Sequence, residues 1–554
     1  MEGRPGMSSP EFAQREGDFT TDTRLLVLVP LASIVGMIGA FVAVALVWLI
    51  GTITNLAYYH RFSSAMVSPA GNQLGIAGVL VPVVGGLIVG LLARYGSEKI
   101  RGHGIPEAME AILIGGSRMD ARVAILKPIA SALSIGTGGP FGAEGPIIMT
   151  GGAFGSLFAQ TLHLTAAERK TLLVAGAAAG MSAIFATPFA AILLAVELLL
   201  FEWKPRSLVP VAAASIIAAI LRVPLLGAGP LFPVPPHAAP QWHELVDFLG
   251  VGILAGLASA GLTLLVYAAE DAFKRLPIHY MWWPLIGGLA VGIGGLAEPR
   301  ALGVGYDTIR DLLAGQLATG VMMLLVVKAI IWSVALGSGT SGGVLAPLLI
   351  MGGALGAAEA HWISASDAGI WATIGMAAMM GGTMRSPLTA VAFVLELTRD
   401  VALLPALLVG CVAAHAVTVL LMRRSILTEK VARRGYHVMR EYSVSPFARF
   451  RVEDVVDCGS ADTTLMELAV NAEAVTYPDE VLEHALHTLA LSRGSSLPVV
   501  LRADPTRCVG TLGWDAIATA YQTGLEDEHR REAGAIAKLL RVLSRRLSPP
   551  ESAD

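Results

Sequence analysis

Long apolar stretches alternate with short polar ones over the first three quarters of the chain. Runs of about 20 apolar residues, long enough to cross a bilayer, lie near 24–50, 75–93, 244–268, 282–298, 320–336 and 401–422. Between them are apolar runs that are shorter or interrupted by Gly and Pro, which predicts half-spanning or tilted helices. The first 23 residues are hydrophilic, so we expect no cleaved signal peptide. The pattern predicts an all-α polytopic membrane domain over residues 24–436.

Two pairs of segments within this domain repeat each other. GAEGPIIMTGGAFGS from Gly142 resembles GGVLAPLLIMGGALGA from Gly342, and ATPFAAILLAVEL from Ala186 resembles RSPLTAVAFVLEL from Arg385. Because both offsets are about 200 residues, we expect two pseudo-symmetric halves, about 24–220 and 243–436, around a solute pathway. Polar glycine-rich stretches followed by apolar helices place helix N-termini at depth. Free N–H groups and the positive dipole end favour an anion there.

Composition and charge agree with a membrane location. Hydrophobic residues make up 54% and charged residues 15%, against about 25% charged in soluble domains. Basic residues follow the second and the last predicted spans, namely Arg94, Lys99, Arg101, Arg423 and Arg424. The positive-inside rule then predicts that both termini are cytoplasmic in a multi-pass protein of the cell membrane. The three cysteines form no CxxC pair, so neither a disulfide framework nor a metal site is indicated.

The tail, residues 437–554, is charged and nearly free of long apolar runs. Its periodicity predicts a small α/β unit: a helix at EVLEHALHTLAL, a strand at SLPVVLR, a turn at ADPTR, a strand at CVGTL and a helix at WDAIATAY. The unit resembles one cystathionine-β-synthase (CBS) module, and RVEDVVDCGSADTTLMEL resembles the leading strand of a second, mostly missing one. The resemblance leaves two roles open: a folded cap that supports a dimer, and nucleotide binding through Asp515.

Four motifs of the membrane domain together resemble one family. In order they are GHGIPEAMEAI from Gly102, GPFGAEGPIIM from Gly139, GSGTSGGVLAP from Gly337 and SILTEKVARRGYH from Ser425. They resemble the signature segments of the CLC family of chloride channels and chloride/proton antiporters. The resemblance covers about residues 24–440. It implies a homodimer in a lipid membrane, with one anion pathway in each subunit between two inversely oriented halves.

The resemblance also implies which residues hold the anion. An anion that must leave again is best held by backbone dipoles. The amides of Val344 and Leu345 would form a central site, and Gly145 would belong to an outer one. The matching motifs add further candidates to the pathway: His103, Gly104, Ile105 and Leu427. No cofactor other than the transported chloride, and no nucleic-acid partner, is expected.

Glu144 stands beside a helix start in an apolar stretch. The dipole that attracts an anion also stabilises a carboxylate, and the resemblance implies that Glu144 is the gating glutamate, which competes with the anion. The alternative is a buried salt bridge with Lys127. Lys127 itself resembles a family lysine that raises the positive potential of the pathway. Leu345 stands where the second repeat would carry a gate, so only one half has one.

Three positions depart from the family pattern. His103 replaces a common serine, Leu427 replaces a common tyrosine, and Leu198 replaces the antiporters' inner proton-transfer glutamate. Glu197 is one residue away, about 100° around the helix. A missing relay favours passive chloride conduction, and an exchanger with another proton route is the alternative. His103 is expected to donate an N–H to the anion and, if protonated, to make the pathway sensitive to pH.

Other classes of protein match single motifs. Gly339-Thr-Ser341-Gly342 fits the Gly-x-Ser-Gly of serine intramembrane proteases, with His415 as a candidate base. Gly337-x-Gly339-x-x-Gly342 matches a dinucleotide fingerprint, but no strand precedes it. We therefore expect a transport protein and not an enzyme, with the protease as the alternative from another class.

Overall fold

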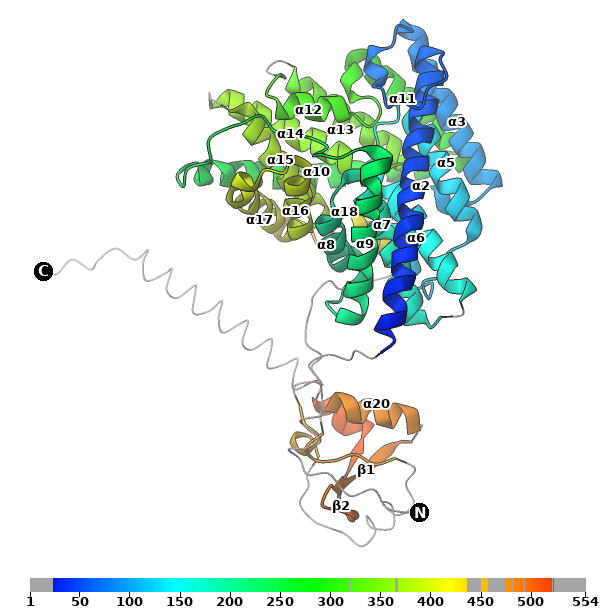
Figure 1. Ribbon diagram of the computed structural model, residues 1–554, viewed down its shortest axis with the longest axis vertical. Coiled ribbons are helices and arrows are strands. Elements are labelled where there is room, and N and C mark those ends of the chain that lie inside the picture. Colours follow the sequence, from blue (N-terminus) through cyan, green and yellow to red (C-terminus); the bar gives the residue numbers. More distant parts are fainter. Residues whose placement is uncertain are drawn as a thin grey trace, which may run out of the picture. The chain divides into compact units, whose positions relative to one another are not determined.

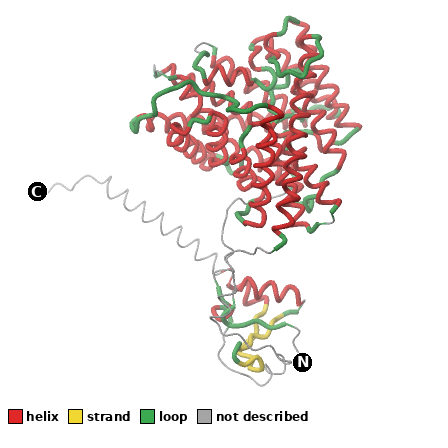
Figure 2. The backbone as a smooth tube through the Cα atoms, viewed as in Figure 1, coloured by secondary structure: helices red, strands yellow, loops and turns green. Residues whose placement is uncertain are grey.

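The structure is a computed structural model that describes residues 23–435, except 163, 318–319 and 364–366, together with 450–456 and 474–522, except 481, 493 and 521. It divides into two compact units, residues 21–440 and a second unit drawn from residues 1–20 and 441–554. The first unit consists of helices, and the described strands lie in the second (Figure 2). An all-α membrane domain and a small α/β tail are thus confirmed as the fold class.

The described residues of the first half of the membrane unit form eight α-helices. They are α2 (Leu25–Tyr59), α3 (Leu80–Tyr95), α4 (Ile105–Leu113), α5 (Ala121–Gly136), α6 (Glu144–Thr161), α7 (Ala166–Phe185), α8 (Pro188–Leu194) and α9 (Pro205–Leu226). A π-helix, η4 (Ala195–Leu200), continues α8. Figure 1 shows α2 as one long rod beside α5, α6 and α9, and α2 packs against all three.

The part of the second half that the structure describes forms nine α-helices. They are α10 (Glu244–Lys274), α11 (Trp283–Ala297), α12 (Tyr306–Leu313), α13 (Val321–Gly337), α14 (Leu345–Trp362), α15 (Ala368–Met384), α16 (Pro387–Thr398), α17 (Leu404–Leu421) and α18 (Ile426–Arg433). Short 3₁₀ turns connect the helices of both halves: η1 (Pro69–Gly71), η2 (Gly75–Val79), η3 (Glu98–Ile100), η5 (Tyr280–Trp282), η6 (Pro299–Ala301) and η7 (Val401–Leu403).

The same close contact between helices occurs once in each half. In α6, Gly151 lies so close to the Gly176 carbonyl of α7 that an added Cβ would be 2.3 Å from its oxygen. In α14, Gly352 stands in the same relation to Gly375 of α15, again at 2.3 Å. Small residues let helix backbones approach in a membrane. The repeat in the sequence therefore corresponds to a repeated helix pair.

Within the described residues, six helical segments are long and apolar enough to span a membrane, including α2, α10 and α9. Five of them coincide with predicted spans. The sixth, α9, is absent from the predicted spans and corrects that prediction. Its apolar run is interrupted by Arg206, Pro210, Arg222 and Pro224, yet the helix continues through all four residues. The predicted span 320–336 is α13, a shorter helix of 17 residues.

The second unit packs helix α20 (Leu482–Ser492) on an antiparallel pair, β1 (Ser496–Leu501) and β2 (Asp504–Gly513). A further helical stretch begins at Trp514, as predicted. Two details differ from the prediction. Residues 504–507 belong to β2, so the turn is shorter than ADPTR, and the expected leading strand contains a 3₁₀ helix, η9 (Val452–Asp454). The rest of that segment, residues 457–473, lies outside the described part of the chain.

Candidate anion pathway at the helix starts

The two repeated glycine loops meet each other in the buried interior of the membrane unit. Gly142 and Gly343 form an antiparallel bridge, in which the Gly343 N–H donates to the Gly142 carbonyl at 2.8 Å and the Gly142 N–H donates back at 3.3 Å. Helix α6 begins immediately after the first loop and α14 immediately after the second. Both N-termini are thus brought to one point, where their unpaired N–H groups and dipoles combine to favour negative charge.

Glu144 occupies that point. Its side chain is fully buried, and its Oε1 accepts a hydrogen bond from the Ala346 N–H, in the first turn of α14, at 2.8 Å. Its Oε2 has no hydrogen-bond partner among the described residues. A Cβ added to Gly142 or Gly343 would lie 1.9 Å or 2.8 Å from this carboxylate. The carboxylate therefore sits where an anion would be held by the same amides, and the glycines make room for it.

Lys127 is not the partner of Glu144. Its buried ammonium donates to the carbonyls of Ile100 at 2.8 Å and Gly102 at 2.7 Å. These carbonyls belong to the loop that leads into α4, so Lys127 fixes the backbone beside His103. The alternative prediction of a buried salt bridge between Glu144 and Lys127 is therefore wrong.

Helix α4 starts against α6. Gly104 has a left-handed φ of 91°, and its N–H donates to the Glu107 Oε2 at 2.9 Å, which caps the helix. A Cβ on Gly104 would lie 2.5 Å from the Gly145 carbonyl oxygen, and a Cβ on Gly145 would lie 1.9 Å from the His103 carbonyl oxygen. The two helix starts can approach this closely only because glycine occupies both positions.

His103 and Ile105 flank that contact and are buried. The exposed fraction of His103 is 2%, and its Nδ1 has no hydrogen-bond partner within the described residues. A buried imidazole nitrogen left without a partner is a free donor or acceptor, depending on the tautomer. The charged groups that act electrostatically on His103 are Lys430, Glu107, Lys127 and Arg434.

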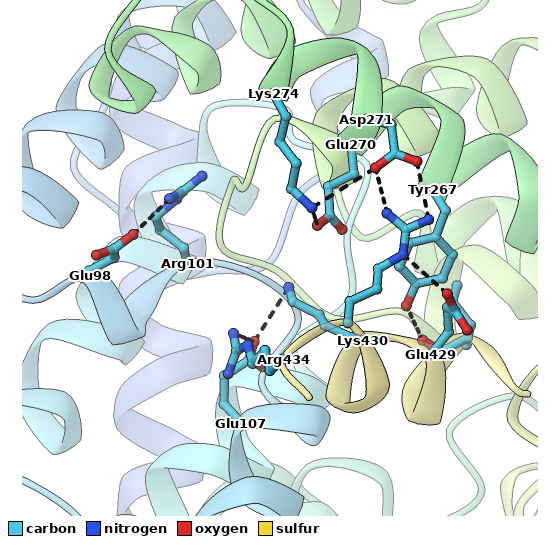
Figure 3. A network of polar contacts seen from close by, with 12 residues as sticks. Glu98, Arg101, Glu107, Tyr267, Glu270, Asp271, Lys274, Glu429, Lys430 and Arg434 are labelled. Carbon is cyan, nitrogen blue, oxygen red and sulfur yellow. Dashed lines mark hydrogen bonds and ion pairs between the residues drawn. The ribbon is translucent and has the colours of Figure 1, made fainter. Parts of the chain in front are cut away.

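Helix α18 brings Leu427 and several charges to the same region. The Ser425 hydroxyl caps this helix through the Thr428 N–H, and Leu427 in its first turn is fully buried. Figure 3 shows Lys430 and Arg434 reaching Glu107, with N–O distances of 3.4 and 3.3 Å. These ion pairs fasten α18 to α4.

A second set of contacts joins α18 to α10, whose Asp271 and Tyr267 are labelled in Figure 3. Arg433 pairs with Asp271 at 2.5 Å, and the Tyr267 hydroxyl donates to the Ile426 carbonyl, also at 2.5 Å. Helix α18 is therefore clamped between α4 and α10, so that the backbone beside Leu427 is held in place.

Glu197 has a partner of its own. Its Oε2 accepts hydrogen bonds from the Thr389 N–H at 2.9 Å and the Thr389 hydroxyl at 2.5 Å, at the start of α16. In the other half, the Glu396 carboxylate accepts from the N–H groups of Phe189 and Ala190 at the start of α8. The two glutamates of the repeat thus cap each other's helix. Leu198, in η4, is fully buried.

The candidate residues for a protease are Ser341 and His415, and the candidate for nucleotide binding is Asp515. The Ser341 hydroxyl is paired at 2.7 Å with the Ser131 hydroxyl of α5, and His415 lies on α17. Asp515 is exposed on the helical stretch after β2. Within the described residues, no three His, Cys, Asp or Glu side chains gather as metal ligands.

Several residues of the candidate pathway region were not identified from the sequence. Glu107 and Lys430 are far apart in the sequence and carry no special pattern, and only the fold brings them together. Lys328 carried a signal that could have been found, since it stands about 200 residues after Lys127, at the offset of the repeat.

Known proteins are similar to this chain in sequence and in fold. A family model described as "Voltage gated chloride channel" matches residues 84–419. A putative ClcB-like chloride channel protein of Ralstonia nicotianae is 30% identical over 350 residues, which cover 61% of this chain and 82% of the relative. The voltage-gated ClC-type chloride channel ClcB of Escherichia coli O81 is 30% identical over 419 residues, which cover 73% of this chain and 98% of the relative.

Among solved structures, a slow cyanobacterial Cl⁻/H⁺ antiporter is similar with a TM-score of 0.64 and 23% identity, over 75% of this chain and 99% of that one. A CLC-type fluoride/proton antiporter follows with a TM-score of 0.62 and 19% identity, over 72% and 97%. At these identities the likeness shows the fold. Because the family model covers more than half of the chain and the relatives are spanned over most of their length, the chain belongs to the voltage-gated chloride channel (CLC) family.

Proposed function

We propose that the protein moves chloride across the membrane, passively and under the control of Glu144. The observation that carries the proposal is the carboxylate of Glu144, buried against the first turn of α14 and hydrogen-bonded to Ala346. Several curated relatives are named as chloride channels. The repeated helix starts supply the dipoles that hold an anion without a full charge, so that the anion can also leave.

In the proposed mechanism, Glu144 closes the outer anion site while its carboxylate is ionised. Opening requires the side chain to leave the Ala346 amide, because anion and carboxylate compete for the same N–H donors. A proton on Glu144 removes its negative charge and weakens that competition. Acidification is therefore expected to open the pathway. The amides of Val344, Leu345 and Gly145 are proposed to hold the passing anion.

His103 is proposed to line the central site as a neutral donor. Its unpartnered Nδ1 can carry the proton that a serine hydroxyl would otherwise offer. Lys127 and Lys430 nearby already supply positive charge. Leu427 offers no hydroxyl to the anion, so His103 is expected to carry more of the side-chain contribution to chloride binding. In a Glu144→Gln background, His103→Ala should weaken chloride binding, whereas His103→Ser should largely preserve it.

Two residues, Leu198 and Glu197, favour passive conduction over proton exchange. Leu198 carries no proton, and Glu197 is engaged in capping α16 through Thr389. A coupled exchanger needs a titratable group between the inner water and Glu144. Exchange remains the second candidate, because the similar solved structures include a Cl⁻/H⁺ antiporter and a fluoride/proton antiporter.

The deciding experiment is a flux measurement on proteoliposomes with the purified full-length chain. A chloride gradient is imposed with and without an opposing proton gradient, and the reversal potential is measured. We expect the reversal potential to follow chloride alone. Proton uptake driven uphill by the chloride gradient would instead assign the protein to the exchangers, and an absence of chloride flux would refute the proposal.

We further propose that the protein works as a homodimer with both termini in the cytoplasm. The basic residues after α3 and α17 support this orientation. The tail is proposed to act as a folded cap, because the described residues of α20, β1 and β2 share an apolar core. Binding of a nucleotide near Asp515 is the alternative, which equilibrium dialysis with labelled ATP would test.

A further inference from the structure

Lys328 of α13 is a buried cation with no role in the mechanism above. Its exposed fraction is 0%, and its Nζ donates to the carbonyls of Ala301 at 2.8 Å and Gly303 at 3.2 Å. Lys127 of α5 makes the same pair of bonds to Ile100 and Gly102. In both cases the acceptors lie 27 and 25 residues before the lysine. The two lysines are therefore equivalent members of the repeat.

The two lysines hold loops at opposite faces of the membrane unit. The loop held by Lys328 lies at the C-terminal end of α2, since the Gly303 N–H donates to the Gly138 carbonyl and the Tyr58 hydroxyl donates to the neighbouring Thr137 carbonyl. The loop held by Lys127 follows α3, the next span, which runs back across the membrane. Each lysine thus stands between one face and the shared helix starts.

The loop held by Lys328 lines a cavity. Residues 303–307 form one wall of a space of about 90 Å³, and Arg310 of α12 and residues 66–69 contribute to the others. Among the described residues, Glu144 is the acidic group that interacts electrostatically with Lys328. Lys328 therefore holds a loop that lines a cavity with room for several waters, and it interacts electrostatically with the carboxylate of Glu144.

Lys328 has no ion-pair partner within 4.0 Å among the described residues, and its two acceptors are neutral carbonyls. Burying an unpaired charge is costly, and a cationic group in a bilayer usually faces a solute path. A neutral donor could hold the same two carbonyls at lower cost. Holding the loop therefore does not explain why the buried group at this position is a cation.

We propose that Lys328 attracts anions into the pathway from the face opposite Lys127, an inference that rests on the proposed chloride transport. The ammonium raises the positive potential between the cavity and the outer site without touching the anion. Lys127 does the same from the other face. The pathway thus has one buried cation on each side of its centre. In the orientation proposed above, Lys328 serves the extracellular side.

The test uses two matched variants, Lys328→Gln and Lys127→Gln. Glutamine keeps an N–H₂ group that can donate to both carbonyls but removes the charge. Chloride currents are recorded from inside-out patches of spheroplasts that express the full-length protein, and chloride is varied on one side at a time. At a separation of about 10 Å and an effective dielectric constant of about 20, loss of one charge should raise the half-saturating chloride concentration about tenfold. The rise is expected on the pipette side for Lys328→Gln and on the bath side for Lys127→Gln.

The outcomes separate this inference from the proposed function. Wild-type protein without chloride current would refute the transport itself. Wild-type current, with Lys328→Gln unchanged on both sides, would overturn only the role of Lys328. An equal loss of current on both sides, accompanied by a lower melting temperature, would show a purely structural lysine and would also overturn it. If the real orientation is reversed, the two variants exchange sides but still act on opposite ones.

Discussion

Replacing Glu144 by Gln removes one negative charge from the meeting point of α6 and α14 and keeps the shape of the side chain. In the structure, the carboxylate accepts the Ala346 N–H at 2.8 Å and lies at two helix N-termini. The amide oxygen of Gln can still accept that bond. The substitution therefore tests the charge and leaves the packing intact.

The magnitude follows from the difference between charged and neutral acceptors. A hydrogen bond to an ionised group contributes about 1.5–3 kcal/mol and one to a neutral group about 0.5–1.5 kcal/mol. Each helix dipole adds a few tenths to about 1 kcal/mol for the carboxylate alone. The closed position should lose about 2 kcal/mol in total. Since 1.4 kcal/mol is a factor of ten, the open fraction at neutral pH should rise about 30-fold while the wild-type protein is mostly closed.

The assay is chloride efflux from proteoliposomes at pH 7.5 and pH 5, with valinomycin to carry the compensating potassium. We expect Glu144→Gln to be faster than wild type at pH 7.5 and nearly independent of pH. Gel filtration and the melting temperature in detergent verify that the variant is folded. A folded variant whose efflux is slower than wild type, or retains the full pH dependence, would refute the assignment of Glu144 as the gate.

Three further outcomes are expected. Gly145→Ala places a Cβ 1.9 Å from the His103 carbonyl oxygen and should lower efflux at least tenfold, whereas Gly261→Ala, with open space around its Cβ, should leave it unchanged. Glu396→Ala leaves the first N–H groups of α8 uncapped and should lower the free energy of unfolding by about 1–2 kcal/mol; an unchanged thermal midpoint would contradict the cap. Burial disfavours charge on His237, but the Ala238 carbonyl and the Asp400 carboxylate outweigh it and raise the pKa of this loop histidine. Because the folded pKa is raised, the stabilisation is complete below the unfolded pKa of about 6.5 and is lost as pH rises through the folded value. The melting temperature of wild type should then approach that of His237→Gln at alkaline pH, and a constant difference would count against the pair.

The sequence by itself determined the architecture of the membrane unit. Apolar length, glycine-rich helix starts and the repeat of about 200 residues are properties of neighbouring positions along the chain, so they can be read without coordinates. They placed Glu144 at the start of α6 and Leu345 at the equivalent start of α14. The order of the four motifs then pointed to the CLC family, and the comparisons confirm it.

Only the tertiary structure decided which groups satisfy the buried charges. The partner of Glu144 is Ala346, 202 residues away, and the partner of Glu197 is Thr389, 192 residues away. Neither pairing leaves a local pattern, because many N–H and O–H donors at such distances along the chain compete for each carboxylate. The salt bridge from Glu144 to Lys127 seemed reasonable for the same reason, yet Lys127 is satisfied by two carbonyls.

The fold also decided where a broken apolar run is still a helix. The prolines of α9 remove backbone N–H groups, but its buried face packs against α2 and α7, and this packing outweighs the local cost. Long-range contacts also decided the environment of Lys328. Its position in the repeat was visible in the sequence, but its burial beside the 301–305 loop and Glu144 depends on contacts between helices that are distant in the chain. Local sequence specifies the helices and their starts, and the long-range packing of those helices determines the electrostatics of the pathway.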